Sequence, residues 1–134
     1  MTVQQQIEAF LGGTPHAVAG ASRDRRKYGN KVLRAYIQQR RAVHPINPNA
    51  EVVEGLVALS DLASLVETMH GVSIVTPPRV TEQIVTQAAD LGIRHLWMQP
   101  GSESDQAIEL ARQAGMNVIW GGPCILVTLR FQED

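Results

Sequence analysis

The stretch His16-Ala-Val-Ala-Gly-Ala-Ser22 decides the fold class, because a short apolar run ends in small residues and a helical pattern follows it. Its first four residues are typical of a buried strand, and the small residues from Gly20 onward predict a tight loop. Apolar residues then recur at helical spacing at Val32, Leu33, Tyr36 and Ile37. A strand that leads through a loop into a helix is the repeating unit of a parallel α/β sheet.

The same alternation continues along the chain. Further strands are predicted over 42–46, 72–75, 93–97 and 116–120, and helices over 3–11, 80–91 and 102–115. A short helix capped by Ser60-Asp61 is predicted to carry Leu62, Leu65 and Val66. Residues 51–59 are predicted to be a connecting segment. Residues 125–131 are apolar and show no helical period. Because parallel strands need long crossovers, we predict one domain over residues 1–134. Its fold is α/β, a Rossmann-like three-layer α/β/α arrangement with a mainly parallel sheet of about five strands.

Composition narrows the class of protein. The chain is 44% hydrophobic and 19% charged, a globular balance, and no apolar run approaches the roughly 20 residues that span a bilayer. With no leader pattern, we expect a soluble, cytoplasmic protein that does not bind membranes. Cys124 is the only cysteine, so no internal disulfide can form. No His-x-x-x-His pair or similar ligand spacing occurs, so no metal site is predicted.

Charge is distributed unevenly. Residues 23–41 hold eight basic residues and one acidic residue, a net charge of +7, while the rest of the chain carries −8. The basic stretch reads as a solvated helix face, an anion site or a nucleic-acid patch. Nucleic acid is disfavoured, because only Tyr28 and Tyr36 supply aromatic rings there and no recognised module accompanies them.

Loops that follow parallel strands are where such folds bind ligands. In the first of them, Gly20, Ala21 and Ser22 would let the backbone approach a phosphate at the start of the next helix. The spacing is not Gly-x-Gly-x-x-Gly, and an ordinary strand-to-helix turn stays an alternative. The second strand ends in Ile46-Asn47-Pro48, without the acidic residue that usually binds the ribose of NAD. This favours coenzyme A or a 2′-phosphorylated dinucleotide.

Four motifs, in order between the predicted strands, carry a family resemblance. They are Val18-Ala-Gly-Ala-Ser22 with Lys27-Tyr-Gly-Asn-Lys31, Val43-His-Pro-Ile-Asn-Pro48, Val75-Thr-Pro-Pro78 and Trp97-Met-Gln-Pro-Gly101. With them the chain resembles the small stand-alone CoA-binding proteins, whose domain is similar to the N-terminal CoA-binding domain of the succinyl-CoA synthetase α subunit. The resemblance implies coenzyme A as cofactor, bound across the strand ends by Gly20, Ala21, Ser22, Arg23, Lys27, Tyr28, Asn30, Lys31, Asn47, Pro48, Val75, Thr76, Pro77, Met98, Gln99 and Pro100.

The synthetase reaction also needs a phosphorylated histidine in a further domain, and none of His16, His44, His70 and His95 has a matching context. We therefore expect a module that binds CoA or acyl-CoA without catalysing a reaction. Two alternative functions stay open: an NAD(P)-binding oxidoreductase or redox sensor, and a CoA-ligase component that acts with a separate subunit. The sequence also leaves open whether the protein forms homo-oligomers or binds a partner protein.

Three other residues read mainly as structural. Cys124 is expected to be a buried structural thiol, with a nucleophile or a mixed disulfide with CoA as the alternative. Trp97 and Trp120 end predicted strands, where packing is expected and stacking on adenine is the alternative.

Overall fold

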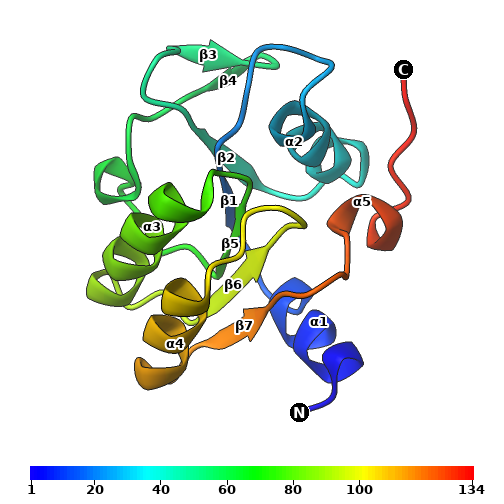
Figure 1. Cartoon of the computed structure of the whole chain (residues 1–134). Helices are drawn as coiled ribbons and strands as arrows, with labels where there is room; N and C mark the ends of the chain where they lie inside the picture. The colour runs from blue at the N-terminus through cyan, green and yellow to red at the C-terminus, as the bar shows by residue number, and fades with distance from the viewer.

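A five-stranded parallel sheet forms the centre of the computed structural model, which describes residues 1–134 (Figure 1). Every neighbouring pair of strands is parallel, and the strand order is β2-β1-β5-β6-β7. The strands are β1 (His16–Ala19), β2 (Val43–Ile46), β5 (Gly71–Ile74), β6 (His95–Met98) and β7 (Asn117–Ile119). All five lie where the sequence predicts them, within two residues at each end.

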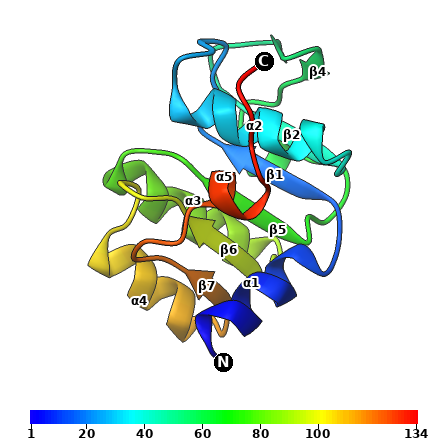
Figure 2. The same cartoon turned by 90° about the vertical axis from the view of Figure 1, so that its right-hand side faces the viewer.

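Helices cover both faces of the sheet, so the predicted three-layer arrangement is confirmed. Figure 1 shows α3 and α4 on one side and α1, α2 and α5 on the other, and Figure 2 shows α2 and α5 side by side. No helix is long and apolar enough to cross a membrane. The helices are α1 (Val3–Leu11), α2 (Tyr28–Gln38), α3 (Pro78–Asp90), α4 (Asp105–Gln113) and α5 (Ile125–Thr128), with a 3₁₀ turn η1 (Leu62–Ser64).

The core has two parts, because successive side chains of each strand point to opposite faces of the sheet. Leu96 and Met98 of β6 pack with Ile84 of α3 on one face, whereas Trp97 between them packs with Phe10 of α1 on the other. Successive side chains of a strand point to opposite faces, so both sets must be apolar when both faces are covered. This explains why consecutive residues of β1 and β5 are all buried, rather than every second one.

The strand order fixes where a ligand crevice can form. From β1 the chain passes through α2 to β2 on one side, while β5 lies on the other side of β1 and continues into α3 on the opposite face. The loops after β1 and β5 therefore diverge at the carboxyl ends of two adjacent strands. In open α/β sheets ligands bind at such a switch point.

Three segments differ from the sequence-based predictions. Residues 51–59 contain a hairpin of β3 (Val52–Val53) and β4 (Leu56–Val57), turning at Glu54 and Gly55, both with positive φ. The helix after Asp61 is only the turn η1, and Val66 is fully exposed. The C-terminal segment forms α5, whose four residues are too few to show a helical period.

Candidate functional site

A cleft of about 570 Å³ lies at the switch point. Its walls come from the loops after β1, β2 and β5 and from the first turn of α2. None of its lining residues is acidic, and none is a histidine or cysteine. The lining residues are Gly20, Ala21, Ser22, Lys27, Tyr28, Gly29, Asn47, Pro48, Asn49, Val75 and Pro77.

Two glycines let three backbone segments meet at the floor of this cleft. Gly20 has a φ of +91°, and a Cβ there would collide with the carbonyl oxygen of Val75. A Cβ on Gly29 would collide with the carbonyl oxygen of Gly20. Only residues without a side chain allow the β1–α2 loop to lie directly against both the end of β5 and the start of α2.

Backbone N–H groups are left without protein partners beside this loop. The N–H groups of Ala21 and Ser22 donate to no protein acceptor, and Lys27, the residue before α2, offers no side-chain cap to the helix. Tyr28 and Gly29 in the first helical turn likewise have free N–H groups. Free N–H groups and the positive end of a helix dipole together form a site that attracts anions such as phosphate.

Asparagine side chains hold the β1–α2 loop in place from two sides. Asn47 donates to the carbonyl oxygen of Ala21 (2.8 Å) and accepts from the N–H of Asn49 (2.7 Å). Asn30, which is fully buried, donates to the carbonyl oxygen of Ser22 (2.8 Å). These amides fix the spacing between the loops rather than extending freely into the cleft.

Ion pairs divide the basic stretch into two groups. Arg25 pairs with Glu54 and Asp134, Arg26 with Asp24, Lys31 with Glu133, and Arg34 with both C-terminal acids. Arg34 holds the pKa of Asp134 below its usual range, and Lys31 does the same for Glu133. Arg23 and Lys27 make no ion pair. Four of the eight basic residues in 23–41 are thus paired with acidic residues, and Lys27 brings an unpaired positive charge to the cleft.

The structure brings nine of the sixteen predicted site residues into the cleft wall. Thr76 lies next to Val75 and bonds Ser102 and Thr81, whereas Met98 is fully buried in the core. Gln99 is fully buried behind Tyr28, and Arg23 and Pro100 are exposed outside the wall. Asn30 and Lys31 are engaged in the contacts described above.

Sequence reasoning missed two lining residues, Gly29 and Asn49. Both lie in motifs that the sequence already distinguishes, namely Lys27-Tyr-Gly-Asn-Lys31 and the Asn47-Pro48-Asn49 turn. A signal for Gly29 was available, because a glycine in the first turn of a helix lowers helix propensity and needs a packing reason.

Tyr28 reaches from the cleft wall to a second polar group behind it. Its hydroxyl lies 2.6 Å from Cys124 Sγ and 3.3 Å from Gln99 Oε1. Burial, reinforced by the contact with Cys124, raises the pKa of Tyr28. The hydroxyl therefore stays protonated and can donate.

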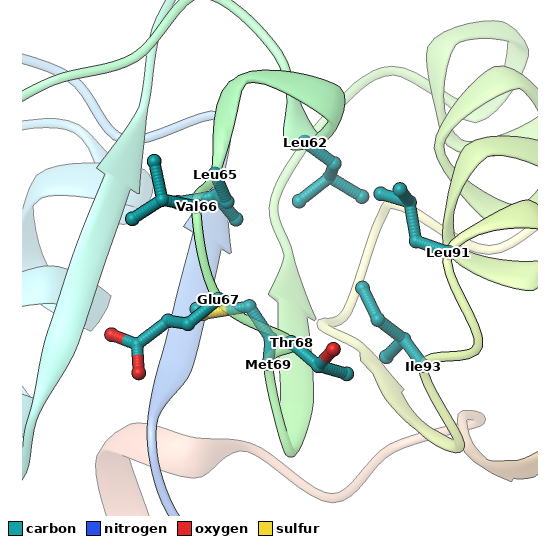
Figure 3. A pocket seen from close by; sticks show the side chains of 8 residues that line it. All are labelled: Leu62, Leu65, Val66, Glu67, Thr68, Met69, Leu91 and Ile93. Carbon is teal, nitrogen blue, oxygen red and sulfur yellow. The ribbon is translucent and has the colours of Figure 1, made fainter.

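An apolar cavity of about 120 Å³ lies elsewhere, between η1 and the segments that lead into β5 and β6 (Figure 3). Figure 3 shows Leu62, Leu91 and Ile93 around it, with Glu67 as its charged group. It lies toward the amino ends of the strands and offers no cation, so it is poorly suited to a phosphate-bearing ligand.

Three histidines lie at the amino ends of the strands, away from the cleft. His16 Nε2 bonds the carbonyl oxygen of Phe10 (2.8 Å), His70 Nε2 bonds that of Ala9 (2.9 Å), and His95 bonds Asn117 (3.1 Å). His44 instead lies 3.3 Å from Glu67. No three His, Cys, Asp or Glu side chains converge in a way that could hold a metal ion.

The two tryptophans have different surroundings. Trp97 is fully buried, packs edge-on against Phe10 and donates to the carbonyl oxygen of Pro123 (3.0 Å). Trp120 is 41% exposed and lies with Met116 beside the edge strand β7. Neither lines the cleft.

Comparisons with solved structures place this arrangement among known proteins. A conserved hypothetical protein from Pyrococcus furiosus is 33% identical with a TM-score of 0.82, over 87% of this chain and 99% of that chain. A hypothetical protein from Pyrococcus horikoshii OT3 is 23% identical with a TM-score of 0.88, over 95% of this chain and 89% of that chain, a likeness of fold.

A larger enzyme contains the same fold as one part. The dinucleotide-forming acetyl-coenzyme A synthetase 1 of Ca. Korarchaeum cryptofilum is 23% identical with a TM-score of 0.73. The match covers 84% of this chain but only 27% of the synthetase. The sequence model of the CoA binding domain matches residues 15–130, which include all three loops of the cleft. The chain therefore belongs to the CoA-binding domain family.

Proposed function

We propose that the cleft at the carboxyl ends of β1 and β5 binds coenzyme A or an acyl-CoA. The observation that carries the proposal is a cleft wall that combines free N–H groups of Ala21 and Ser22 with the unpaired Lys27 and contains no carboxylate. Such a wall suits the diphosphate of a nucleotide cofactor. Membership of the family supports CoA as that cofactor.

The end of β2 supports CoA over NAD. NAD sites of this type place a carboxylate there to accept from the ribose hydroxyls. Here Asn47 occupies the position, and its amide is used to join the two loops. The nearby Glu54 is engaged by Arg25 and Asn30. A phosphorylated ribose meets no negative charge in the wall.

The same wall supports binding without catalysis. General acid–base catalysis most often uses a His, Asp or Glu side chain within reach of the substrate, and the cleft wall contains none of these. Its two titratable side chains are Lys27, which we assign to the phosphates, and Tyr28, whose pKa is raised by burial so that it stays protonated. We therefore propose that the protein is a module that binds CoA without catalysing a reaction. Detectable turnover with CoA or NAD(P) would instead favour a redox enzyme or a ligase component.

Calorimetric titration tests the proposal. We expect saturable binding of CoA, weaker binding of dephospho-CoA and NAD, which lack a phosphate on the ribose, and no tighter binding of NADP than of CoA. Ser22→Asp should remove CoA binding, because it places a negative charge among the free N–H groups of the loop. Gln106→Glu on the exposed face of α4 is a matched control, because it adds the same single negative charge outside the cleft.

Preference for NAD or NADP would contradict the proposal and favour a redox or sensing protein. Absence of heat with all four ligands, checked by thermal shift, would also contradict it.

A further inference from the structure

The C-terminal segment 131–134 runs along α2 and packs against a buried arginine (Figure 2). The Gln38 side chain donates to the carbonyl oxygen of Gln132 (2.7 Å) and accepts from its N–H (3.1 Å). One turn earlier on α2, the guanidinium of Arg34 lies 5.0 Å from the centre of the Phe131 ring. Arg34 is only 3% exposed, so its charge has to be paired within the protein.

Arg34 joins this segment to the loop that faces the proposed CoA cleft. On one side, its Nη1 donates to Asp134 (2.7 Å) and to Glu133 (3.3 Å). On the other side, its Nη2 donates to the carbonyl oxygen of Arg25 in the β1–α2 loop (2.9 Å), and its Nε donates to Asn30 Oδ1 (2.6 Å). All three nitrogen atoms of the guanidinium are therefore used.

The fully buried Asn30 extends this contact to the wall of the cleft. Because Arg34 donates to its Oδ1, the orientation of the amide is fixed, and its Nδ2 donates to the carbonyl oxygen of Ser22 (2.8 Å). Ser22 lines the cleft and carries one of the free N–H groups that we assign to the diphosphate. A continuous series of hydrogen bonds thus leads from the C-terminal acids to the β1–α2 loop.

We propose that Arg34 is a positioning residue for the CoA site, through which docking of residues 131–134 on α2 strengthens CoA binding. Glu133 and Asp134 hold the guanidinium, and the guanidinium holds the loop at Arg25 and, through Asn30, at Ser22. Coupling of this kind is reciprocal, so bound CoA holds the C-terminal segment on α2 more tightly by the same factor. This inference rests on the proposed CoA site.

Electrostatic attraction by itself predicts the opposite role for the two C-terminal acids. Neither Glu133 nor Asp134 lines the cleft, and the side chain of each is 60% exposed. Removing their charges would make the basic stretch more positive and would strengthen binding of a phosphate-bearing ligand through space. Positioning through Arg34 predicts weaker binding, so the sign of the change separates the two effects.

Calorimetric titration of the full chain with CoA tests the proposal. The double variant Glu133→Ala, Asp134→Ala removes both acceptors of Arg34 at exposed positions, and urea denaturation checks that it is folded. We expect it to bind CoA about fivefold more weakly than the wild-type protein does. Asp90→Ala, at the exposed end of α3, is the matched control and should leave CoA binding unchanged.

A conservative substitution separates the charge of Arg34 from its geometry. Arg34→Lys keeps the positive charge but offers one nitrogen atom in place of three. We expect it to bind CoA no better than the double alanine variant, and full binding by the lysine variant would overturn the positioning role. If urea shows that Arg34→Lys is unfolded, the two exposed alanine substitutions still decide the question.

Hydrogen exchange measured by NMR supplies a readout that a merely structural role would not change. The N–H of Gln132 is bonded to Gln38 while the segment is docked, so CoA should slow its exchange about fivefold in the wild-type protein. In the double alanine variant CoA should have little effect on it. The N–H of Gln5, bonded to the Thr2 hydroxyl at the start of α1, reports an unrelated local opening and should not respond to CoA.

The same titrations distinguish the two ways in which the inference can fail. If the wild-type protein binds CoA and the double variant binds it equally or more tightly, the inference is overturned and the proposed function stands. Exchange at Gln132 that does not respond to bound CoA would have the same meaning. Absence of CoA binding by the wild-type protein would overturn both.

Discussion

Gly29 lies against Gly20 so closely that no side chain fits between the first turn of α2 and the β1–α2 loop. The carbonyl oxygen of Gly20 occupies the space that a Cβ of Gly29 would need. This contact sets how near the helix start and its free N–H groups come to the floor of the cleft.

The contact predicts the sign of the Gly29→Ala substitution. Helix propensity alone would make alanine more stable by about 1 kcal/mol. Because the clash is with backbone, we expect the opposite, a loss of about 1–3 kcal/mol in unfolding free energy, and weaker CoA binding. Urea denaturation and calorimetry measure the two effects. Gln83→Ala on the exposed face of α3 is the control, and a stabilised Gly29→Ala protein would contradict the packing argument.

Free and paired cations should contribute differently to ligand binding. Lys27 has no ion pair and lines the cleft, so Lys27→Met should weaken CoA binding by about tenfold and reduce its salt dependence. Arg26 is satisfied by Asp24, whose pKa it lowers to about 2, so Arg26→Met should have a much smaller effect. Calorimetry at two salt concentrations compares them, and equal losses would show that the site responds only to overall charge.

A buried hydroxyl pair joins α2 to β5. Tyr36 and Ser73 are both fully buried, and their oxygen atoms lie 2.7 Å apart. Tyr36→Phe leaves the Ser73 hydroxyl without this partner and should cost about 1–3 kcal/mol of unfolding free energy. Adding Ser73→Ala should recover part of that loss. A double-mutant cycle in urea measures the coupling, and strictly additive losses would mean that the bond contributes nothing.

Stability should fall in mild acid because of His16. Burial lowers the pKa of His16 from 6.5 to about 4, and the neighbouring Arg41, His70 and His95 add positive charge. Its Nδ1 has no partner, so a proton there would be buried without an acceptor. The unfolded chain binds this proton more readily, so stability is full above pH 6.5 and declines by about 3 kcal/mol toward pH 4.

Urea midpoints between pH 7.5 and pH 4.5 test this expectation. His16→Gln keeps a donor for the Phe10 carbonyl oxygen and cannot be charged, so its midpoint should depend less on pH. An unchanged pH profile in that variant would assign the acid sensitivity to other groups, with His95 the first to examine, since burial also lowers its pKa.

Local sequence determined the five parallel strands, four of the five helices and the loops that face the cleft. Apolar runs such as 16–19 and 72–75, punctuated by glycine and proline, report directly on backbone conformation. Nine of the predicted site residues line the cleft because the carboxyl ends of parallel strands meet at one edge. That these loops lie at one edge of the sheet follows from the alternation of strands and helices along the sequence.

Only the tertiary structure decided which side chains of those loops face the cleft and which serve the fold. Met98 is buried because the strand pleat turns it toward α3 and α4, and one residue of register would reverse that direction. Arg34 is neutralised by Asp134, and Tyr28 meets Cys124, across separations of 100 and 96 residues. Local periodicity carries no information on such contacts, because they depend on strand order and helix packing over the whole chain.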